Sequence, residues 1–146
     1  MNRYPLLIMA VLLGLCWSFS WLFTLHYGLG LYGRVTGLLA ISAGILLLSI
    51  AAGLFIARKT TVMPTRAPNK LVTEGIYRVT RNPMYLGMLL ILSGFPLMID
   101  TIIGLICPLV FFLIMNRIII PREEQVVEGV FGKDYLEYKS KTRRWI

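Results

Sequence analysis

The sequence predicts an all-α, polytopic membrane protein whose helices cross the bilayer four times. Of its 146 residues, 57% are hydrophobic and only 15% are charged, and the mean hydropathy is +0.73. A soluble domain has about 45–50% apolar residues and about a quarter charged residues. This excess is too large for the core of one small domain, so much of it must face lipid. The values exclude a soluble globular protein, a disordered tail and a disulfide scaffold, and the length is that of a single domain, residues 1–146.

Two long apolar runs form the first two predicted spans, residues 5–25 and 35–57. Neither contains a formal charge, and each is as long as the roughly 20 residues that a transmembrane helix needs. The first run exceeds the apolar region of a signal peptide and no small-residue cleavage site follows it, so we expect a retained helix. In the second, small residues recur four apart, which favours close helix packing in lipid. The pairs are Gly33/Gly37, Ala40/Gly44 and Ser49/Gly53.

The third and fourth apolar runs, residues 84–99 and 101–120, are separated only by Asp100. We predict a short antiparallel helical hairpin with its tip near Asp100. Pro96 and Pro108 lie inside the two runs and are expected to kink each helix or to end it locally. Hydropathy leaves open whether this hairpin crosses the whole bilayer or forms a re-entrant pair.

The net charge of +8, with a pI near 9.9, is explained by topology rather than by nucleic-acid binding. With four crossings, fourteen of the fifteen Lys and Arg residues fall on one side, and only Arg34 falls on the other. The positive-inside rule assigns the basic side to the cytoplasm. We therefore expect both termini, the 58–83 segment and the 121–146 segment to be cytoplasmic, in an inner or plasma membrane. One His and two Cys are too few for a metal cluster.

The 58–83 segment ends on a pattern that predicts a helix start at the membrane surface. Asn82 is a favoured N-cap residue and Pro83 suits the first helical position. The free N–H groups of such a helix attract carboxylates or phosphates, and Arg81 adds a positive charge. Tyr77 and Tyr85 supply aromatic faces beside it. The alternative is an ordinary interfacial cap with a snorkelling arginine and membrane-belt tyrosines.

The 121–146 segment begins with a second predicted helix start. Pro121 precedes Glu123 and Glu124, whose charges complement the helix dipole. The rest of the segment is typical of an amphipathic helix that lies on the membrane, with basic side chains on anionic headgroups. Just before it, Asn116 and Arg117 interrupt the fourth apolar run. Arg117 either snorkels to the interface or lines a polar cavity, and both readings stay open.

Two patterns together resemble a known family. The first is Leu-Val-Thr-x-Gly-x-Tyr-x-x-x-Arg-Asn-Pro-x-Tyr, residues 71–85, where many relatives have His in place of Asn82. The second, residues 123–138, starts with Glu-Glu and continues to Phe-Gly-x-x-Tyr-x-x-Tyr. In this order, separated by a hairpin, they resemble the isoprenylcysteine carboxyl methyltransferase and phospholipid methyltransferase family of integral-membrane enzymes. The resemblance covers residues 58–146.

The resemblance implies S-adenosylmethionine as methyl donor, held at the cytoplasmic face, and no metal. The carboxylate of this cofactor suits Arg81 and the helix that starts at Pro83, and its ribose hydroxyls and ammonium suit a carboxylate such as Glu123. The residues that correspond to the family's cofactor-binding positions are Asn69, Lys70, Leu71, Val72, Tyr77, Asn82, Pro83, Met84, Tyr85 and Glu123.

The implied acceptor is a lipophilic or small membrane-partitioning carboxylate, thiol or amine. A carboxylate or thiolate needs only positioning and desolvation, whereas an amine also needs a base, for which Glu124 is the nearby candidate. In the carboxyl methyltransferases an arginine just before the acidic pair positions the substrate. Its aligned position here is Ile119, which departs from the pattern; Arg117, our predicted acceptor-binding residue, and Arg122 lie nearby.

Two other function classes remain as alternatives. A small four-helix transporter depends on an intramembrane acid, but the first two spans contain no Asp or Glu. A non-enzymatic membrane scaffold with a basic tail would not require the motif at residues 81–85. A Rossmann methyltransferase is excluded, because Gly28-Leu29-Gly30 follows a helix rather than a strand.

Overall fold

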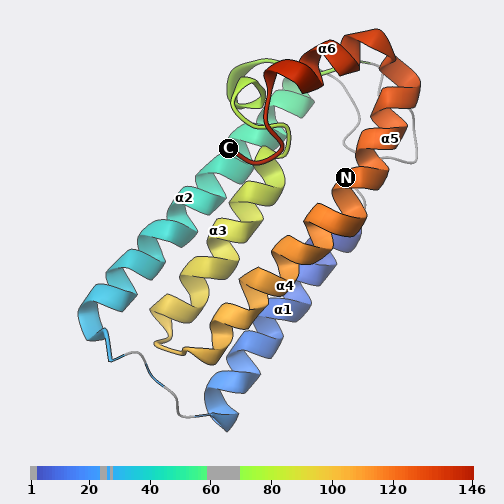
Figure 1. Cartoon of the computed structure of the whole chain (residues 1–146). Coiled ribbons are helices and arrows are strands. Elements are labelled where there is room, and N and C mark those ends of the chain that lie inside the picture. The colour runs from blue at the N-terminus through green and yellow to red at the C-terminus, as the bar shows by residue number, and fades with distance from the viewer. Residues whose placement is uncertain (1–2, 24–25, 27, 59–69) are drawn as a thin grey trace.

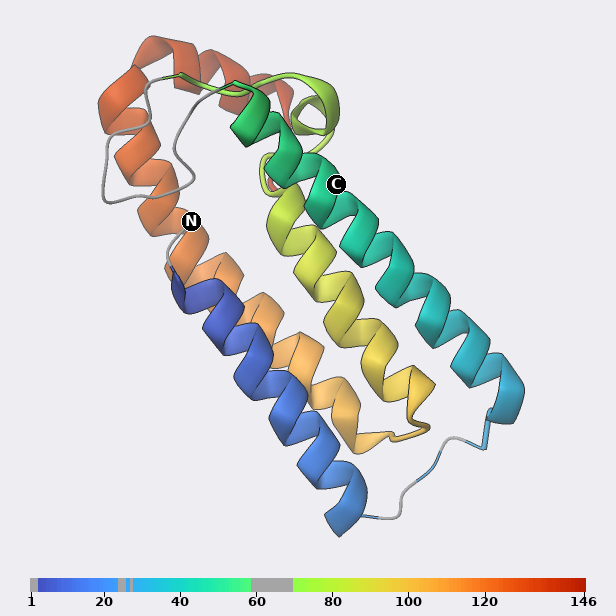
Figure 2. The same cartoon turned by 180° about the vertical axis from the view of Figure 1, so that it is seen from behind.

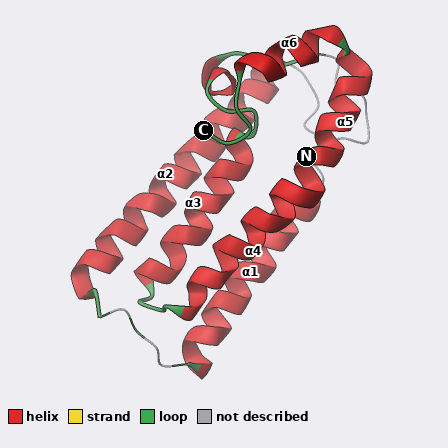
Figure 3. Ribbon diagram, in the orientation of Figure 1, coloured by secondary structure: helices red, strands yellow, loops and turns green. Residues whose placement is uncertain are grey.

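The computed structural model describes residues 3–23, 26, 28–58 and 70–146. Within these residues the secondary structure is helical apart from one isolated β-bridge, between Thr80 and Arg143, which confirms the predicted all-α class (Figure 3). The α-helices are α1 (Arg3–Leu22), α2 (Gly30–Ala57), α3 (Pro83–Met98), α4 (Ile106–Ile114), α5 (Ile120–Phe131) and α6 (Lys133–Lys141). Shorter elements are the 3₁₀ turns η1 (Gly75–Arg78) and η2 (Ile103–Leu105) and the π-helix η3 (Met115–Ile119).

Three of the described helical segments are long and apolar enough to cross a membrane: Tyr4–Leu22, Gly30–Ala57 and Ile103–Phe131. The helix α3 is also apolar but has only 16 residues. In the third segment the charged residues begin at Arg117, so the apolar part ends close to the predicted limit at residue 120. The chain is therefore an integral-membrane protein with three or four spanning helices.

The four long helices form two pairs. The helix α2 packs chiefly against α3, and α1 lies along α4 and also contacts α3 (Figures 1 and 2). The start of α1, the start of α3 and the α5–α6 region lie toward one end of this bundle, which we call the α6 end. The predicted hairpin tip lies at the opposite end, where Asp100 adopts a left-handed φ of 57°.

The contact between α2 and α3 is made by glycines that face each other. A Cβ atom on Gly37 would lie 2.5 Å from the carbonyl oxygen of Gly94, and one on Gly44 would lie 2.6 Å from that of Gly87. The small-residue pattern of the second span is thus confirmed as a packing surface at these two positions. Gly53 belongs to the same pattern but has no atom within 4 Å of its would-be Cβ, so it lies outside the contact.

A hydrophobic core joins α1, α3 and the α4–α5 helix. Its buried members are Leu12, Cys16, Tyr85, Met88, Leu92, Cys107, Phe111, Met115 and Ile120. Both cysteines of this core are free. The core reaches the α6 end through Tyr85 and Ile120, and these two residues therefore connect the membrane-embedded bundle to the segments described next.

The predicted helix start at Pro121 is confirmed only in part: Pro121 lies in the first turn of α5, but α5 continues directly from η3 without a break. The chain remains helical from Ile106 through η3 to Phe131, and Pro121 lies within this long helix. Proline inside an α-helix lacks an N–H and clashes with the carbonyl four residues earlier. The π-helix immediately before Pro121 widens the turn and relieves that clash. The predicted proline breaks also differ in detail: Pro96 lies near the end of α3, and Pro108 lies in the first turn of α4.

Candidate functional site

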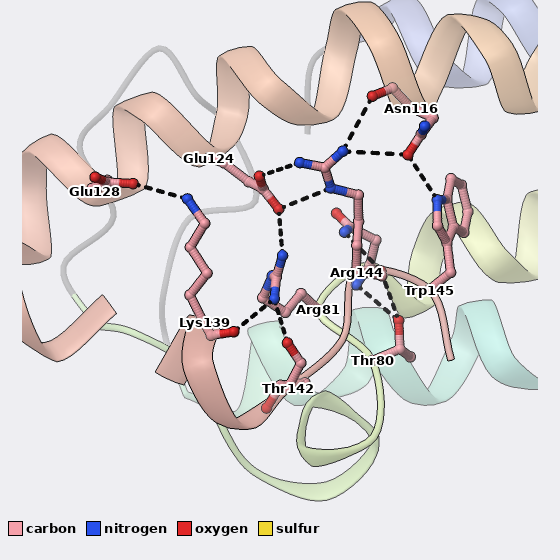
Figure 4. Close-up of polar contacts among 10 residues, drawn as sticks. Thr80, Arg81, Asn116, Glu124, Glu128, Lys139, Thr142, Arg144 and Trp145 are labelled. Carbon is pink, nitrogen blue, oxygen red and sulfur yellow. Dashed lines mark hydrogen bonds and ion pairs between the residues drawn. The ribbon is translucent and has the colours of Figure 1, made fainter. Parts of the chain in front are cut away.

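At the α6 end, three segments distant in the sequence meet: residues 70–82, the continuous η3–α5 helix, and the residues after α6. Figure 4 shows the polar contacts among them. We name residues 142–146 the C-terminal strap, because they return from α6 across the start of α3 to η3.

The centre of this region is an ion cluster of Arg81, Glu124 and Arg144, which we call the Arg–Glu–Arg cluster. Nη2 of Arg81 donates to Oε1 of Glu124 at 3.0 Å. Arg144 donates from Nη2 to Oε2 at 2.7 Å and from Nε to Oε1 at 3.3 Å. Arg81 also donates to the backbone carbonyls of Lys139, at 3.0 Å, and of Thr142. The side chains of Arg81 and Glu124 are only 10% and 9% exposed, so this is a largely buried cluster.

The environment of Glu124 opposes its protonation. Burial alone would raise its pKa, but the hydrogen bonds and charges of Arg144 and Arg81 outweigh burial and hold the pKa below its ordinary value. A carboxylate with a lowered pKa and both oxygens occupied is a poor proton acceptor.

The C-terminal strap is bound mainly through the carbonyl of Arg144. This oxygen accepts hydrogen bonds from Oγ1 of Thr80, at 3.1 Å, and Nδ2 of Asn82, at 3.0 Å. Nε1 of Trp145 donates to Oδ1 of Asn116 at 3.1 Å. Asn82 is the N-cap residue of α3 and Pro83 occupies its first turn, as predicted, but the Asn82 side chain makes no capping hydrogen bond. Its amide instead donates to the strap.

A second contact joins the two sequence motifs directly. The hydroxyl of Tyr85 donates to the carboxylate of Glu123, with distances of 2.7 and 2.8 Å to its two oxygens. Tyr85 is buried and Glu123 is partly buried. Burial raises the pKa of Glu123 above its ordinary value, and the hydrogen bond from Tyr85 opposes that rise. Glu123 and Glu124 are adjacent in the chain but have different partners and opposite pKa shifts.

The segment before α3 packs against α2. Val72, Tyr77 and Met84 are buried together with Ala51 of α2, and the ring of Tyr77 makes an edge contact with Phe55, with centroids 5.3 Å apart. The Tyr77 carbonyl accepts a hydrogen bond of 2.6 Å from the hydroxyl of Tyr138 in α6. Burial raises the pKa of Tyr77 above its usual range and raises that of Tyr135, also in α6, to about 12, so both phenols stay neutral at physiological pH.

An open groove of about 520 Å³ lies between this segment and α6. Leu71, one of the predicted cofactor residues, contributes to it. The other lining residues are Thr73, Arg78, Asp134, Glu137, Tyr138, Lys141 and Thr142. Neither Tyr85 nor Glu123 lines this groove.

The remaining predicted residues are placed as follows. Asn69 lies outside the described residues, and Lys70 is exposed at their edge. Arg117 is exposed in η3 and makes no hydrogen bond or ion pair with any described residue. Arg122 is also exposed. In the described part of the chain no group of three or more His, Cys, Asp or Glu side chains is arranged to hold a metal.

Sequence reasoning missed the strap residues and their partner in η3. Arg144 and Trp145 were taken as part of a membrane-surface tail, yet both contact Asn116. The only available signal was Asn116 itself, a polar residue within an apolar run. Its partner could not be inferred from spacing, because 28 residues separate it from Arg144.

Comparison with known proteins gives one family match and several similar proteins. The profile of the phospholipid methyltransferase family matches residues 32–134. An uncharacterized protein of Haemophilus influenzae is 40% identical over 63 residues, which cover 43% of this chain and 100% of that protein. Protein-S-isoprenylcysteine O-methyltransferase B of Arabidopsis thaliana is 37% identical over 73 residues, which cover 48% of this chain and 36% of the plant protein.

A probable protein-S-isoprenylcysteine O-methyltransferase of Oryza sativa subsp. indica is 34% identical over 76 residues, covering 50% of this chain and 38% of that protein. The chain thus spans little more than a third of the length of the two plant relatives that it matches.

Proposed function

The chain belongs to the phospholipid methyltransferase family, and on that premise we propose that it transfers a methyl group from S-adenosylmethionine to a lipophilic or small membrane-partitioning acceptor. Partial similarity to plant enzymes named protein-S-isoprenylcysteine O-methyltransferase supports methyl transfer. The same membership favours an enzyme over the transporter and scaffold alternatives. The observation that carries the proposal is the Tyr85–Glu123 hydrogen bond, since it joins the two motifs at one place beside the start of α3.

The polar groups at the α6 end fit this cofactor. Nε of Arg81 is buried and has no hydrogen-bond partner among the described residues, and it lies beside the positive end of the α3 dipole, so it suits the cofactor's carboxylate. Among the described residues Glu123 accepts from a single donor, Tyr85, and a carboxylate has capacity for further donors. The ribose hydroxyls or the ammonium of the cofactor match that capacity.

When bound, S-adenosylmethionine supplies a methyl group carried on a positively charged sulfur. Arg81 and Glu123 would hold this cofactor, and its methyl group would be the electrophile for a lone pair of the acceptor. The protein has to align the two reactants and exclude water. No residue needs to form a covalent bond with the substrate.

The state of Glu124 narrows the choice of acceptor. Its oxygens are bound by Arg81 and Arg144 and its pKa is lowered, so we assign it to positioning rather than to the predicted role of a base. An acceptor that reacts without a protein base, such as a carboxylate or thiolate, fits best. Arg117, exposed at the boundary of the apolar helix, is suited to bind such an anion.

We further propose that the α6 end faces the cytoplasm. The start of α1 and the two motif segments lie toward this end, and fourteen of the fifteen Lys and Arg residues fall on that side of the predicted topology. The polar cofactor then enters from the cytosol, and the acceptor enters from the bilayer.

Cofactor binding by the purified protein in detergent tests the proposal. Titration calorimetry of the wild type with S-adenosylmethionine should give a measurable Kd. Glu123→Ala should raise that Kd about tenfold or more, since a hydrogen bond to a charged group contributes about 1.5–3 kcal/mol. Glu128→Ala removes a partly exposed carboxylate from α5 itself and serves as the matched control. A wild type that does not bind the cofactor at millimolar concentration would refute the proposal.

A further inference from the structure

The C-terminal strap adds polar contacts between the start of α3 and the η3–α5 helix, which the hydrophobic core also joins. The backbone N–H of Arg81 donates to the carbonyl of Arg143 at 2.9 Å, and the carbonyl of Arg144 holds Thr80 and Asn82. The side chain of Arg144 reaches in the other direction, to Glu124 of α5 and Asn116 of η3 (Figure 4). One residue of the strap therefore contacts both the start of α3 and the helix that carries the acidic pair.

The anchor for Arg144 in η3 is produced by Pro121. In the π-helix the N–H of Ile120 donates to the carbonyl of Met115, five residues earlier. The next donor in that series would be residue 121, directed at the carbonyl of Asn116, but proline has no N–H. This carbonyl lies 3.4 Å from Nη1 of Arg144, which also lies 3.3 Å from the side-chain oxygen of Asn116. A carbonyl left without its helical donor thus accepts from the strap.

The orientation of Glu124 determines the orientation of Glu123. Neighbouring residues of an α-helix point about 100° apart, so fixing one side chain of α5 fixes the direction of the next. Glu124 is held by two guanidinium groups, and Glu123 is then turned toward Tyr85 of α3. Without the contacts to Arg144, Glu124 would retain one ion pair, to Arg81, and α5 would be less restricted in its rotation.

The charge balance of the cluster separates the roles of its two arginines. Two cations face one carboxylate, and Arg81 alone already neutralises it. Removing Arg144, whose side chain is 32% exposed, therefore leaves no buried charge unpaired. We expect the variant to fold, because Glu124 keeps its ion pair with Arg81. Arg144 is not required to neutralise Glu124. Its side chain instead links the strap to η3 and α5.

We propose that Arg144 is a positioning residue of the methyl-transfer site: through Glu124 and Asn116 it fixes the rotation of α5, and thereby directs Glu123 at the cofactor. The inference rests on the proposed function and extends it, since it makes the C-terminal strap part of the site. Arg144 touches neither cofactor nor acceptor in this role.

A double-mutant cycle on cofactor affinity tests the role. Arg144→Ala should raise the Kd for S-adenosylmethionine about five- to tenfold, and Arg144→Lys should restore only part of the loss, because lysine cannot bridge Glu124 and Asn116 with a planar fork. Because Arg144 acts through Glu123, the double variant Glu123→Ala/Arg144→Ala should bind no more weakly than Glu123→Ala alone. The matched control is Arg143→Ala, which removes the same charge from an exposed neighbouring side chain and keeps the backbone carbonyl.

Each alternative outcome is decisive. If Arg144→Ala binds as tightly as Arg143→Ala, or if the losses in the double variant simply add, the positioning role is overturned. If Arg144→Ala shows no cooperative thermal unfolding while Arg143→Ala does, the arginine is a folding residue and the proposal is also overturned. A wild type that does not bind the cofactor refutes the proposed function itself, which none of the variant results does.

Discussion

Removing the carboxylate of Glu124 should be among the most destabilising changes at the α6 end. Glu124→Ala deletes the acceptor of three hydrogen bonds, one from Arg81 and two from Arg144. Arg144, 32% exposed, can regain water, whereas Arg81, 10% exposed, stays buried with only carbonyl partners. Loss of one partner of a buried ion pair costs about 3–5 kcal/mol. We expect about 3 kcal/mol, the low end, because the backbone carbonyls of Lys139 and Thr142 still accept from Arg81.

Denaturant unfolding in detergent at neutral pH measures this loss, and Glu137→Ala provides the comparison. Glu137 pairs with Lys141 on the exposed face of α6, where an ion pair contributes little. Its removal should therefore leave the free energy of unfolding nearly unchanged. If Glu124→Ala is as stable as Glu137→Ala, the buried cluster does not hold the α6 end together and the reasoning fails.

The pH dependence of the stability difference between wild type and Glu124→Ala gives a second check. The arginines lower the pKa of Glu124 in the folded state below the ordinary value of 4.5. Its contribution to stability is therefore complete above the ordinary value and disappears as the pH falls through the lower, folded-state pKa. The stability difference between wild type and Glu124→Ala should be constant at neutral pH and narrow only in acid below 4.5.

Two further predictions concern the bundle and the acceptor. Gly94→Ala should lower the free energy of unfolding by about 1–3 kcal/mol, because its Cβ would lie 2.5 Å from the Gly37 carbonyl. Gly53 has open space around it, so Gly53→Ala should leave the free energy of unfolding unchanged or raise it by about 0.5–1 kcal/mol. Equal melting temperatures for the two variants would contradict this prediction. Arg117→Ala should keep the Kd for S-adenosylmethionine and lower kcat with a native-membrane acceptor fraction and methyl-labelled cofactor. A large loss of cofactor binding would instead assign Arg117 to the cofactor.

The sequence was sufficient for those features that depend on local chemistry. The apolar runs located the four long helices, and the single acid between the last two located the tip at Asp100. The glycine spacing of the second span identified its packing face at Gly37 and Gly44. Each of these features follows from hydrophobicity or from the absence of a side chain, and none of them requires knowledge of a distant partner.

The features that were missed depend on partners far away in the chain. Asn82 is the N-cap residue of α3, but its side chain makes no capping bond and its amide donates to the carbonyl of Arg144, 62 residues later. Pro121 has the sequence of a helix start, but a π-helix accommodates it within a longer helix. In both cases a tertiary contact or a change of helical geometry overrode a local preference. The same holds for the Arg–Glu–Arg cluster, whose members come from three separate segments.

The facing glycines of α2 and α3 determine the position of Tyr85 in the site. Gly87 lies two residues after Tyr85 on α3, and its would-be Cβ lies 2.7 Å from the carbonyl of Gly44. A Cβ atom on either Gly44 or Gly87 would push the two backbones apart. The position of Tyr85 in the bundle therefore depends on the absence of a side chain at both residues. Natural variation at Gly44 or Gly87 would therefore displace the phenol that Glu123 binds, although neither glycine contacts a polar group of the site.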